Sequence, residues 1–381
     1  MEVTIFSWGD SSDVNLWSNF PYFICKGFEE NGCKVNRVNI REKQKKIEKI
    51  FDKIVRPFCK LFLPSTTYSY NRSFLCSLIT KKIMKQAIFK YPKTELYVSL
   101  AFSWNPYEYT SAPCLQMCDW TYKFWIENDI GKNIDWLEMH EVKRQQKMLE
   151  GAALNYVFRT ECRELLKKDK EINIYPEYYT AINCMLSNLD EEQIIRQKID
   201  SNMVLFMGAE RYRHGAEVLV RAINKLVSEG TDIECYYIGI TEDMLTMEEK
   251  PNKRNHFAGY LRKSNPEQKD LYYELCLKAK VVVNTNDDFV SIAALNEANY
   301  LYTPCIVSKH IQTTSEYGNE IKIGQYCDNN VSDLMSAVMK VMNMYPDKYY
   351  KLCKKCHGTY SNRTWKAAIS KILNAVAVLE D

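Results

Sequence analysis

The chain has 381 residues, of which 46% are hydrophobic and 26% are charged, values typical of a folded globular protein. This length is too great for one ordinary core and fits two domains. The net charge of +3 gives no argument for a nucleic-acid partner. No apolar run approaches the roughly 20 residues that a membrane-spanning helix needs.

The N-terminal half alternates predicted strands and helices. Residues 3–7, 19–31 and 34–38 form a strand–helix–strand opening, with Asn31-Gly32 as the helix stop. The start lacks the basic segment and long apolar core of a signal peptide, so we expect a cytosolic chain. Further predicted elements are a helix at 135–153 and strands at 96–102, 112–117, 156–159 and 172–175. This pattern predicts an N-terminal Rossmann-like domain over residues 1–183.

Residues 41–93 are strongly basic, with fourteen Lys and Arg against three Asp and Glu, a local charge of +11. Within 43–63, apolar residues recur at helical spacing between the lysines. Two interpretations remain open. A basic amphipathic helix of residues 41–63 can lie on an anionic membrane surface. Alternatively, the helix packs on a core and its basic face is solvated.

The C-terminal half repeats the alternation after a bridging helix at 186–198. Its predicted strands are 203–207, 233–239, 256–260, 280–284 and 304–308, and its helices are 215–229, 265–278, 291–300 and 332–344. Strands alternating with helices predict a parallel sheet, here a second Rossmann-like domain over residues 184–363. An amphipathic helix at 364–379 either caps this domain or crosses back to the first one. We assign residues 364–381 to the second alternative.

Two segments of the second domain indicate a nucleotide site. Residues 204–215 and 281–297 each contain a buried strand, a polar or Gly-containing loop and the start of a helix. In an open parallel sheet such loops lie at the carboxyl ends of the strands, where ligands bind. Each also places the unpaired N–H groups of a helix start at that edge, an arrangement that suits a diphosphate.

With these segments the chain resembles the GT-B-fold glycosyltransferases, in particular the retaining family four. The resemblance implies two Rossmann-like domains whose parallel sheets face an interdomain cleft. Gly208 and Gly215 match the glycines of the donor loop in that family. The Arg and Lys of the loop are replaced by Ala209 and His214. Arg211 and Arg213 lie in the same loop, and we predict that they neutralise the diphosphate.

The second motif of the family is a pair of glutamates. Glu297 matches the second, which holds the ribose, whereas Phe289 occupies the spacing of the first. Asp288 or Asp287 is predicted to orient the sugar instead, although both also suit plain capping of the next helix. The N–H groups near Val290, Ser291 and Ile292 are predicted to face the diphosphate.

The remaining site predictions concern the nucleotide base and the acceptor side. Tyr260 and Leu261 follow a strand where the family places the base of the nucleotide, although both are also ordinary strand-end residues. On the acceptor side we predict four residues in loops that follow strands, and for Asp119 a turn or a cap is an equally simple role. These residues are Gly9, Asp10, Asp119 and Arg159.

The cysteines do not indicate a metal or haem site. Fourteen are scattered through predicted elements and are interpreted as buried thiols of a cytosolic protein. Cys114 and Cys118 lack a partner pair for zinc. The run Cys353-Lys-Lys-Cys356-His357 fits the haem-attachment pattern, but it lies in a Lys-rich, helical segment.

The resemblance implies transfer of a sugar from a UDP- or GDP-type donor to a glycan or lipid-linked glycan, with retention, in polysaccharide or glycoconjugate synthesis. No cofactor, metal or nucleic acid is expected. We expect a cytoplasmic protein, with a peripheral position at the inner face of a membrane left open. The main alternative is a catalytically silent relative that binds glycans or acts as a scaffold. An epimerase or phosphorylase on the same fold is a third interpretation.

Overall fold

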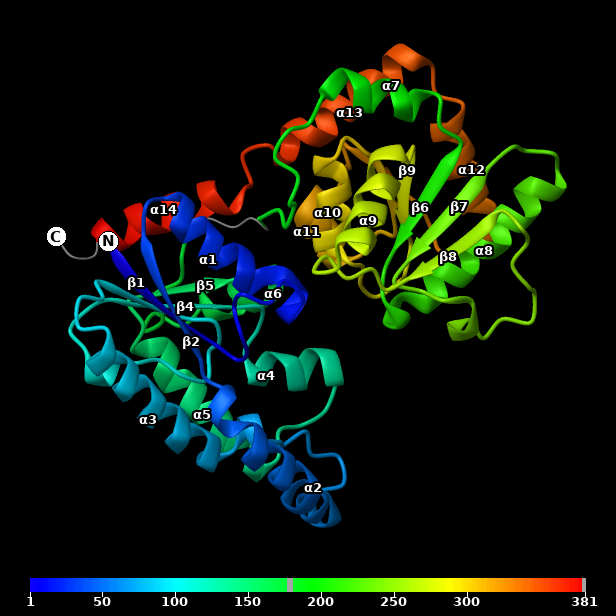
Figure 1. Cartoon of the computed structure of the whole chain (residues 1–381). Helices are drawn as coiled ribbons and strands as arrows, with labels where there is room; N and C mark the ends of the chain where they lie inside the picture. The colour runs from blue at the N-terminus through cyan, green and yellow to red at the C-terminus, as the bar shows by residue number, and fades with distance from the viewer. Residues whose placement is uncertain (177–180, 379–381) are drawn as a thin grey trace. The chain divides into compact units, whose positions relative to one another are not determined.

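The computed structural model describes residues 1–176 and 181–378. They fall into two compact units (Figure 1). Unit 1 contains residues 1–176 and the C-terminal helix, and unit 2 contains residues 181–364. Each unit has one parallel sheet with helices on both faces, so the predicted α/β class with two parallel sheets is confirmed.

The sheet of unit 1 has five parallel strands in the order β2-β1-β3-β4-β5. The strands are β1 (Glu2–Ser7), β2 (Lys34–Asn39), β3 (Leu96–Ser99), β4 (Cys114–Cys118) and β5 (Leu154–Val157). Strands β3 and β5 are buried along their whole length, because helices cover both faces of the sheet. The chain reverses its direction across the sheet between β1 and β3. Open parallel sheets bind ligands beyond the carboxyl ends of strands at such a switch point.

Helices pack on both sides of this sheet. Figure 1 shows α1 (Phe20–Glu30) and α14 (Trp365–Val378) on one side and α3 (Phe74–Lys90) and α5 (Trp136–Glu150) on the other. The other helical segments of unit 1 are η1 (Leu16–Asn19), η2 (Glu42–Gln44), α2 (Lys45–Phe62), η3 (Tyr70–Arg72), η4 (Tyr107–Tyr109), α4 (Tyr122–Phe124), η5 (Trp125–Ile130) and α6 (Thr160–Leu166). Helix α5 begins with a capping box, because the Asp135 carboxylate accepts from the Glu138 N–H and Glu138 accepts from the Asp135 N–H.

The C-terminal helix α14 packs on α1 of unit 1. A Cβ atom on Gly27 would lie 2.9 Å from the Trp365 carbonyl oxygen, so only glycine allows this close approach. The Trp365 ring meets Phe20 edge-on at 5.6 Å, and the Asn31 side chain donates to the Lys366 carbonyl at 2.8 Å. The predicted return of this helix to the N-terminal domain is therefore confirmed; its predicted end at residue 379 lies outside the described residues.

The sheet of unit 2 has six parallel strands in the order β11-β10-β9-β6-β7-β8, with a switch point between β6 and β9. This is the strand order of dinucleotide-binding folds. The strands are β6 (Met203–Met207), β7 (Glu234–Ile238), β8 (Asn255–Gly259), β9 (Val281–Asn284), β10 (Cys305–Val307) and β11 (Gly324–Tyr326). Its helical segments are α7 (Glu191–Ile199), η6 (Glu210–Tyr212), α8 (Arg213–Ser228), η7 (Glu242–Met244), α9 (Pro266–Lys278), α10 (Ile292–Tyr300), α11 (Ile311–Tyr317), α12 (Val331–Met342) and α13 (Pro346–Tyr360).

Two apolar cores lie on the two faces of this sheet. Val204 and Phe206 of β6 join the core with α8 and α12, whereas Leu205 of the same strand joins the core with α9 and α10. The alternation follows from the period of two along a strand, which sends successive side chains to opposite faces. In Figure 1 the two helix pairs lie on opposite sides of the sheet.

Several elements differ from the sequence predictions, and helices α3, α6 and α11 were not predicted. Residues 172–175 make only an isolated bridge, Asn155 with Ile174, rather than a strand. Pro176 follows directly and has no N–H with which to extend the ladder. The edge strand β11 was not predicted, because three residues are too few to show a periodic pattern.

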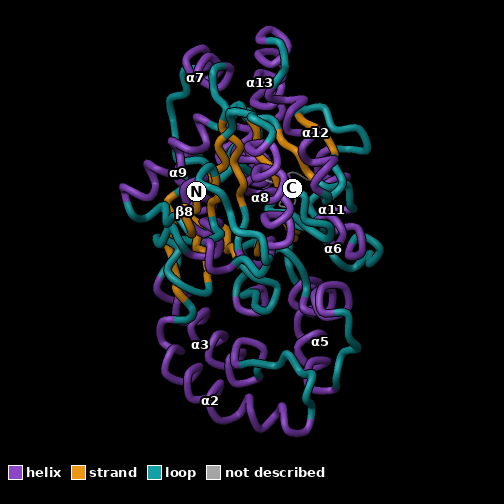
Figure 2. The backbone as a smooth tube through the Cα atoms, turned by 90° about the vertical axis from the view of Figure 1, so that its right-hand side faces the viewer, coloured by secondary structure: helices purple, strands orange, loops and turns teal. Residues whose placement is uncertain are grey.

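Helix α2 is unusual because none of its residues is buried. In its first half, Phe51 packs on the rings of Tyr68 and Tyr70. In its second half the apolar side chains face solvent within unit 1, with Ile54 64%, Phe58 63% and Leu61 73% exposed. The structure therefore does not support the core-facing interpretation for the second half of α2. Figure 2 shows α2 grouped with α3 and α5. Within the described residues, no helix is both long and apolar enough to cross a membrane.

Candidate functional site

The loops after β6 and β9 of unit 2 meet at the switch point of its sheet. Strands β6 and β9 pair directly, with Phe206 opposite Val283. A Cβ atom on Gly208 would lie 3.1 Å from the Asn284 side-chain nitrogen, and one on Gly215 would lie 3.0 Å from the backbone nitrogen of Asn286. Both glycines therefore allow the first loop and the start of α8 to approach the second loop. The structure brings together the two segments that sequence analysis selected.

The first loop presents its cations along a cavity of about 540 Å³, lined by Glu210, Arg211, Arg213, His214, Glu217 and Thr246. The Arg211 guanidinium stacks over the rings of Tyr212 and Phe289, at 4.7 Å and 5.2 Å. Arg213 lies 3.7 Å from the buried Glu217 carboxylate, which also accepts from Thr246. Arg211 is thus the cation of this loop whose guanidinium lies on aromatic rings rather than beside a carboxylate, and Phe289 supports it.

The second loop carries the predicted acids on its exposed surface. The Asp287 carboxylate accepts from Asn329 at 3.2 Å and lies 3.9 Å from His214. Asp288 is exposed, and neither acid caps α10, whose N-cap is Ser291 without a side-chain cap bond. The N–H groups of Val290 and Ile292 donate to the Gln312 side chain and to the Val290 carbonyl. A diphosphate at this helix start would therefore compete with Gln312 for the Val290 N–H.

Glu297 lies inside α10 and is buried in a polar cluster. Both carboxylate oxygens lie 2.6 Å from Lys263 Nζ, and they accept from the Tyr272 and Tyr273 hydroxyls at 2.8 Å and 3.1 Å. Four bonds fill the lone-pair positions of a carboxylate. A ribose hydroxyl that binds Glu297 would have to displace one of these donors.

Sequence analysis missed Lys263, Tyr272 and Tyr273. They come from the loop after β8 and from α9, at least 24 positions before Glu297, and no local pattern links them to it. Burial raises the pKa of both tyrosines, and the neighbouring Glu297 charge adds to that rise, so both stay protonated as donors. In the same loop, Tyr260 is 64% exposed and Leu261 packs partly on the core.

Unit 1 has a cavity of its own at the switch point between β1 and β3. Its volume is about 360 Å³, and its walls come from the loops that follow β1, β3 and β4 and from η3. Four of the seven tryptophans of the chain line it: Trp8, Trp17, Trp104 and Trp120. Arg41, Arg72 and Asp119 are the charged groups of its wall.

Of the four predicted acceptor-side residues, one lines this cavity, one contacts a residue of its wall, and two lie outside the wall. Asp119 lines the cavity and accepts from the Trp17 indole at 3.2 Å. Gly9 has a φ of +135°, and a Cβ atom there would lie 2.7 Å from the side chain of Leu16, another wall residue. Asp10 forms a turn with Ser12, outside the wall. Arg159 is also outside the wall, paired with Asp129 at 2.7 Å.

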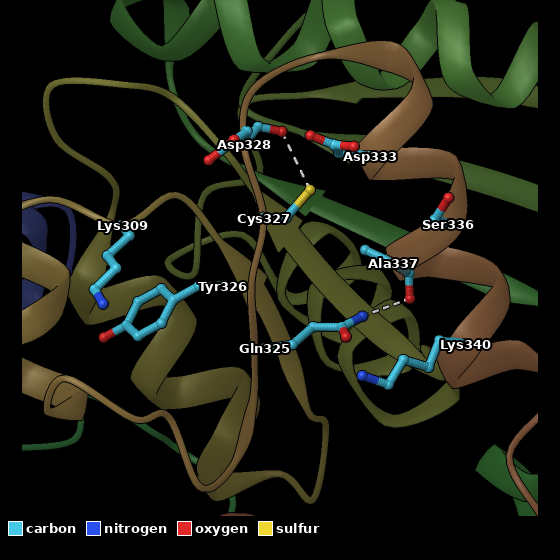
Figure 3. A pocket seen from close by; sticks show the side chains of 9 residues that line it. All are labelled: Lys309, Gln325, Tyr326, Cys327, Asp328, Asp333, Ser336, Ala337 and Lys340. Atoms are coloured by element: carbon cyan, nitrogen blue, oxygen red, sulfur yellow. Dashed lines mark hydrogen bonds between the residues drawn. The ribbon is translucent and has the colours of Figure 1, made fainter.

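Another cavity, of about 430 Å³, lies beside the edge strand β11 and α12 (Figure 3). Lys309 and Lys340 on its wall are matched by Asp328 and Asp333. Gln325 is held by the Ala337 carbonyl, at 2.6 Å. The balanced charges give this cavity no preference for the charge of a ligand.

The cysteines that fit metal or haem patterns lie in the cores. Cys353 and Cys356 are fully buried on α13, and the neighbouring His357 bonds the Tyr300 carbonyl at 2.6 Å. Cys114 is buried at the start of β4. In the described ranges 1–176 and 181–378, no three His, Cys, Asp or Glu side chains are grouped so that they could hold a metal ion.

Comparison with solved structures identifies the fold. The sucrose-phosphate synthase of Thermosynechococcus elongatus matches with a TM-score of 0.65 at 14% identity, covering 100% of this chain and 99% of that one. HepE of Anabaena, solved with UDP and glucose, matches with a TM-score of 0.59 at 10% identity, covering 98% and 99%. This chain has the GT-B fold.

A further solved structure also matches nearly the whole chain. A putative UDP-N-acetylglucosamine 2-epimerase of Listeria monocytogenes matches with a TM-score of 0.58 at 12% identity, covering 99% of this chain and 95% of that one. No family model and no curated protein matches the sequence. Membership of family four within the GT-B fold therefore stays a prediction, and so do the roles of the individual residues.

Proposed function

We propose that this protein is a glycosyltransferase that moves a sugar from a nucleotide-sugar donor to a glycan or lipid-linked glycan. The observation that carries the proposal is the meeting of two glycine-containing or polar loops at the switch point of a six-stranded sheet, within a GT-B fold that spans the whole chain. Relatives in fold support a UDP donor, since HepE was solved with UDP and glucose. The proposed reaction is retaining and needs no cofactor.

In this proposal unit 2 binds the donor diphosphate. Charge develops on the diphosphate as the sugar–phosphate bond breaks, and positioned donors stabilise it. Arg211 supplies a planar guanidinium, which suits phosphate oxygens, and its stacking on Tyr212 and Phe289 limits its motion. Arg213 adds charge along the same cavity wall, His214 lines that wall beside it, and Asp288 orients the sugar.

Calorimetric titration with UDP and GDP tests the donor site. We expect Arg211→Ala to weaken binding of the preferred diphosphate about tenfold or more, because a charge-assisted hydrogen bond is lost. The matched control is Arg196→Ala, since Arg196 is 77% exposed on α7. Equal affinity of the Arg211 variant and the control would reject Arg211 as a diphosphate contact, and no binding by the wild type would reject the donor site.

The role of Glu297 needs a paired experiment, because this carboxylate is also part of a buried ion pair. We expect Glu297→Ala to lose donor turnover, and turnover at the wild-type rate would reject its ribose contact. Lys263→Met is the matched control. It breaks the same ion pair but keeps the carboxylate, so turnover that survives in a folded Lys263→Met variant separates ribose binding from stability.

We also propose that α2 docks on an anionic membrane surface, which would place a lipid-linked acceptor near unit 1. The exposed apolar stripe of α2 is flanked by five exposed lysines, Lys45, Lys46, Lys49, Lys53 and Lys60. Apolar burial and charge attraction add for such helices.

Sedimentation with phosphatidylserine vesicles tests this docking. The wild type should bind them at low salt, and the double variant Phe58→Glu, Leu61→Glu should not. Phe89→Glu is the control, because Phe89 is 89% exposed but lies on α3. Absence of wild-type binding, or equal loss in the control, contradicts the proposal.

The saturated Glu297 carboxylate and the replacements Ala209 and His214 favour one alternative, a silent relative that binds glycans. Such a protein binds no nucleoside diphosphate in the titration above. The fold shared with the putative epimerase gives a third candidate, which is tested by incubating the protein with UDP-N-acetylglucosamine and no acceptor. A change in the sugar without transfer identifies an epimerase.

A further inference from the structure

The unit 1 cavity has walls suited to a sugar ring. Trp8 and Trp104 lie 5.7 Å apart, centroid to centroid, and the Trp17 indole is fixed by Asp119. A pyranose exposes apolar C–H groups on its faces, and aromatic rings bury them while polar groups at the rim hold the hydroxyls. Trp17 has a φ of +42° and is followed by two more residues with positive φ. Such strain in bulky residues concentrates at functional sites.

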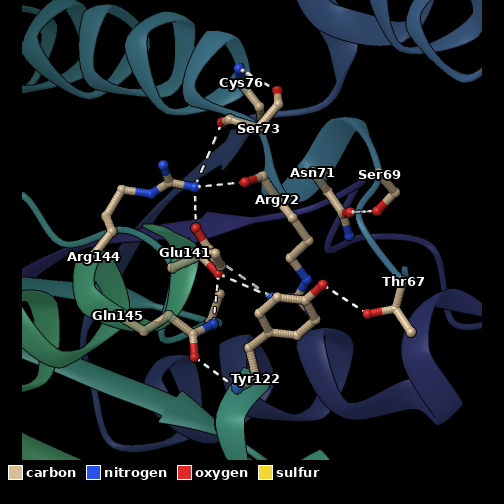
Figure 4. A network of polar contacts seen from close by, with 12 residues as sticks. Thr67, Ser69, Asn71, Arg72, Ser73, Cys76, Tyr122, Glu141, Arg144 and Gln145 are labelled. Atoms are coloured by element: carbon tan, nitrogen blue, oxygen red, sulfur yellow. Dashed lines mark hydrogen bonds and ion pairs between the residues drawn. The ribbon is translucent and has the colours of Figure 1, made fainter. Parts of the chain in front are cut away.

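Neighbouring side chains fix the orientation of Arg72, one of the two cations in the wall of this cavity. Its Nη1 atom donates to Ser103 Oγ at 3.2 Å, and its guanidinium lies 4.5 Å from the centre of the Tyr122 ring (Figure 4). Gln145 fixes both supports, donating to Ser103 at 2.9 Å and accepting from the Tyr122 N–H at 2.7 Å. Arg144 donates to the Arg72 carbonyl at 3.0 Å. Arg72 therefore has a set orientation while its side chain stays 24% exposed.

The charges around Arg72 do not cancel. Glu141 is fully buried, lies 3.8 Å from Arg72 and also pairs with Arg144. One carboxylate thus faces two guanidinium groups, which leaves a surplus of one positive charge within this cluster. The wall also carries the Asp119 carboxylate, which accepts from the Trp17 indole. Burial raises the pKa of Glu141 against the opposing effect of the two arginines, so protonation would enlarge this surplus. Arg41, the other cation of the wall, is paired with Glu48 at 2.7 Å.

We propose that this cavity binds a pyranose of the acceptor that carries an anionic group, with the ring against the tryptophans and the anion on Arg72. The proposal rests on the proposed function, which makes unit 1 the acceptor side. A uronic acid carboxylate and a sugar phosphate offer the same chemistry, an anionic oxygen group on a sugar ring. Glu141 and Arg144 act as positioning residues for Arg72.

Tryptophan fluorescence of the full chain gives a direct binding test, since four of its seven tryptophans line the cavity. The probes are methyl β-glucuronide, glucose 6-phosphate, neutral methyl β-glucoside and inorganic phosphate. We expect at least one anionic sugar to bind about tenfold or more tighter than the neutral glucoside, since hydrogen bonds to charged groups are the stronger ones. The tighter of the two anionic sugars then names the anionic group.

Variants assign the preference to Arg72. Arg72→Gln should abolish the preference for an anion, whereas Arg72→Lys should keep part of it, because the charge stays while the planar fork is lost. Lys147→Gln on α5 is the matched control for charge and should bind like the wild type. Partial binding by Arg72→Lys also shows that the site is still folded.

Three results would overturn the proposal: equal binding of neutral and anionic sugars, a preference that survives Arg72→Gln, or inorganic phosphate binding as tightly as glucose 6-phosphate. The last would mean that the tryptophans contribute nothing. Calorimetry with UDP on the same variants keeps the two proposals apart. If the chain binds an anionic sugar but no nucleotide, the donor assignment fails and the cavity assignment stands.

Discussion

The two units each bury a carboxylate close to the switch point of a parallel sheet, but they surround it differently. Glu297 of unit 2 has one lysine and two tyrosine hydroxyls on its two oxygens, so its charge and its lone pairs are matched. Glu141 of unit 1 is shared by two arginines, Arg72 at 3.8 Å and Arg144, so one negative charge faces two positive charges. A matched cluster holds structure together, whereas an unmatched one beside a cavity has capacity left for a ligand.

The difference also bears on the donor proposal. The predicted ribose contact falls on the saturated carboxylate, whereas the predicted diphosphate contact falls on Arg211, which rests on aromatic rings. We therefore expect Arg211 to report on nucleotide binding more directly than Glu297 does. Substitution of Glu297 should in turn lower the stability of the protein more than substitution of Arg211 does.

The largest effect on stability should come from Lys263→Met. It leaves the Glu297 carboxylate buried without its counter-charge, and breaking a buried pair costs about 3–5 kcal/mol. Chemical denaturation measures this loss. The double variant Lys263→Met, Glu297→Gln should recover part of it, because no buried charge then remains. A single variant as stable as the wild type would contradict the matched-cluster interpretation.

Glu141→Gln should destabilise unit 1 by less, about 2 kcal/mol, because both arginines that it abandons keep some exposure to solvent. The same denaturation experiment measures it. A loss as large as that of Lys263→Met would mean that the two carboxylates play the same structural role.

A third buried carboxylate, Glu138, allows the comparison to be tested by the pH dependence of stability. Burial acts to raise the pKa of Glu138, but bonds from Lys132 and Thr67 outweigh it and lower the pKa to about 2 from its ordinary value of 4.5. A lowered folded-state pKa contributes stability that is complete above about 4.5 and is lost as the pH falls toward about 2. The stability difference between wild type and Glu138→Gln should therefore shrink across that window. A difference that stays constant with pH would contradict the assignment.

The smallest effect should come from α2. Phe58→Glu with Leu61→Glu changes two exposed side chains and should alter the free energy of unfolding by no more than about 0.5 kcal/mol. Thermal unfolding measures this change. A large loss of stability would show that the apolar stripe is covered in the folded protein, and would count against membrane docking.

The sequence by itself determined the alternation of strands and helices, because the spacing of apolar residues within a short segment indicates which of the two that segment forms. It also located the loops around Gly208 and Asp287, since glycines and polar residues after a buried strand mark a strand end. The apolar stripe of the last helix fitted a cap on its own domain as well as the predicted return to the first unit. Contact between Gly27 and Trp365, far apart in sequence, decided between the two.

Only the tertiary structure decided which side chains meet at the candidate sites. Lys263 and Glu297 are 34 positions apart, and Arg72 and Glu141 are 69 apart, on elements whose proximity follows from the order of strands in each sheet. The tryptophan cavity likewise combines the ends of three strands. The sequence of one such loop does not show which other loops it will contact. These contacts form only when the parallel sheet brings the carboxyl ends of its strands to one edge.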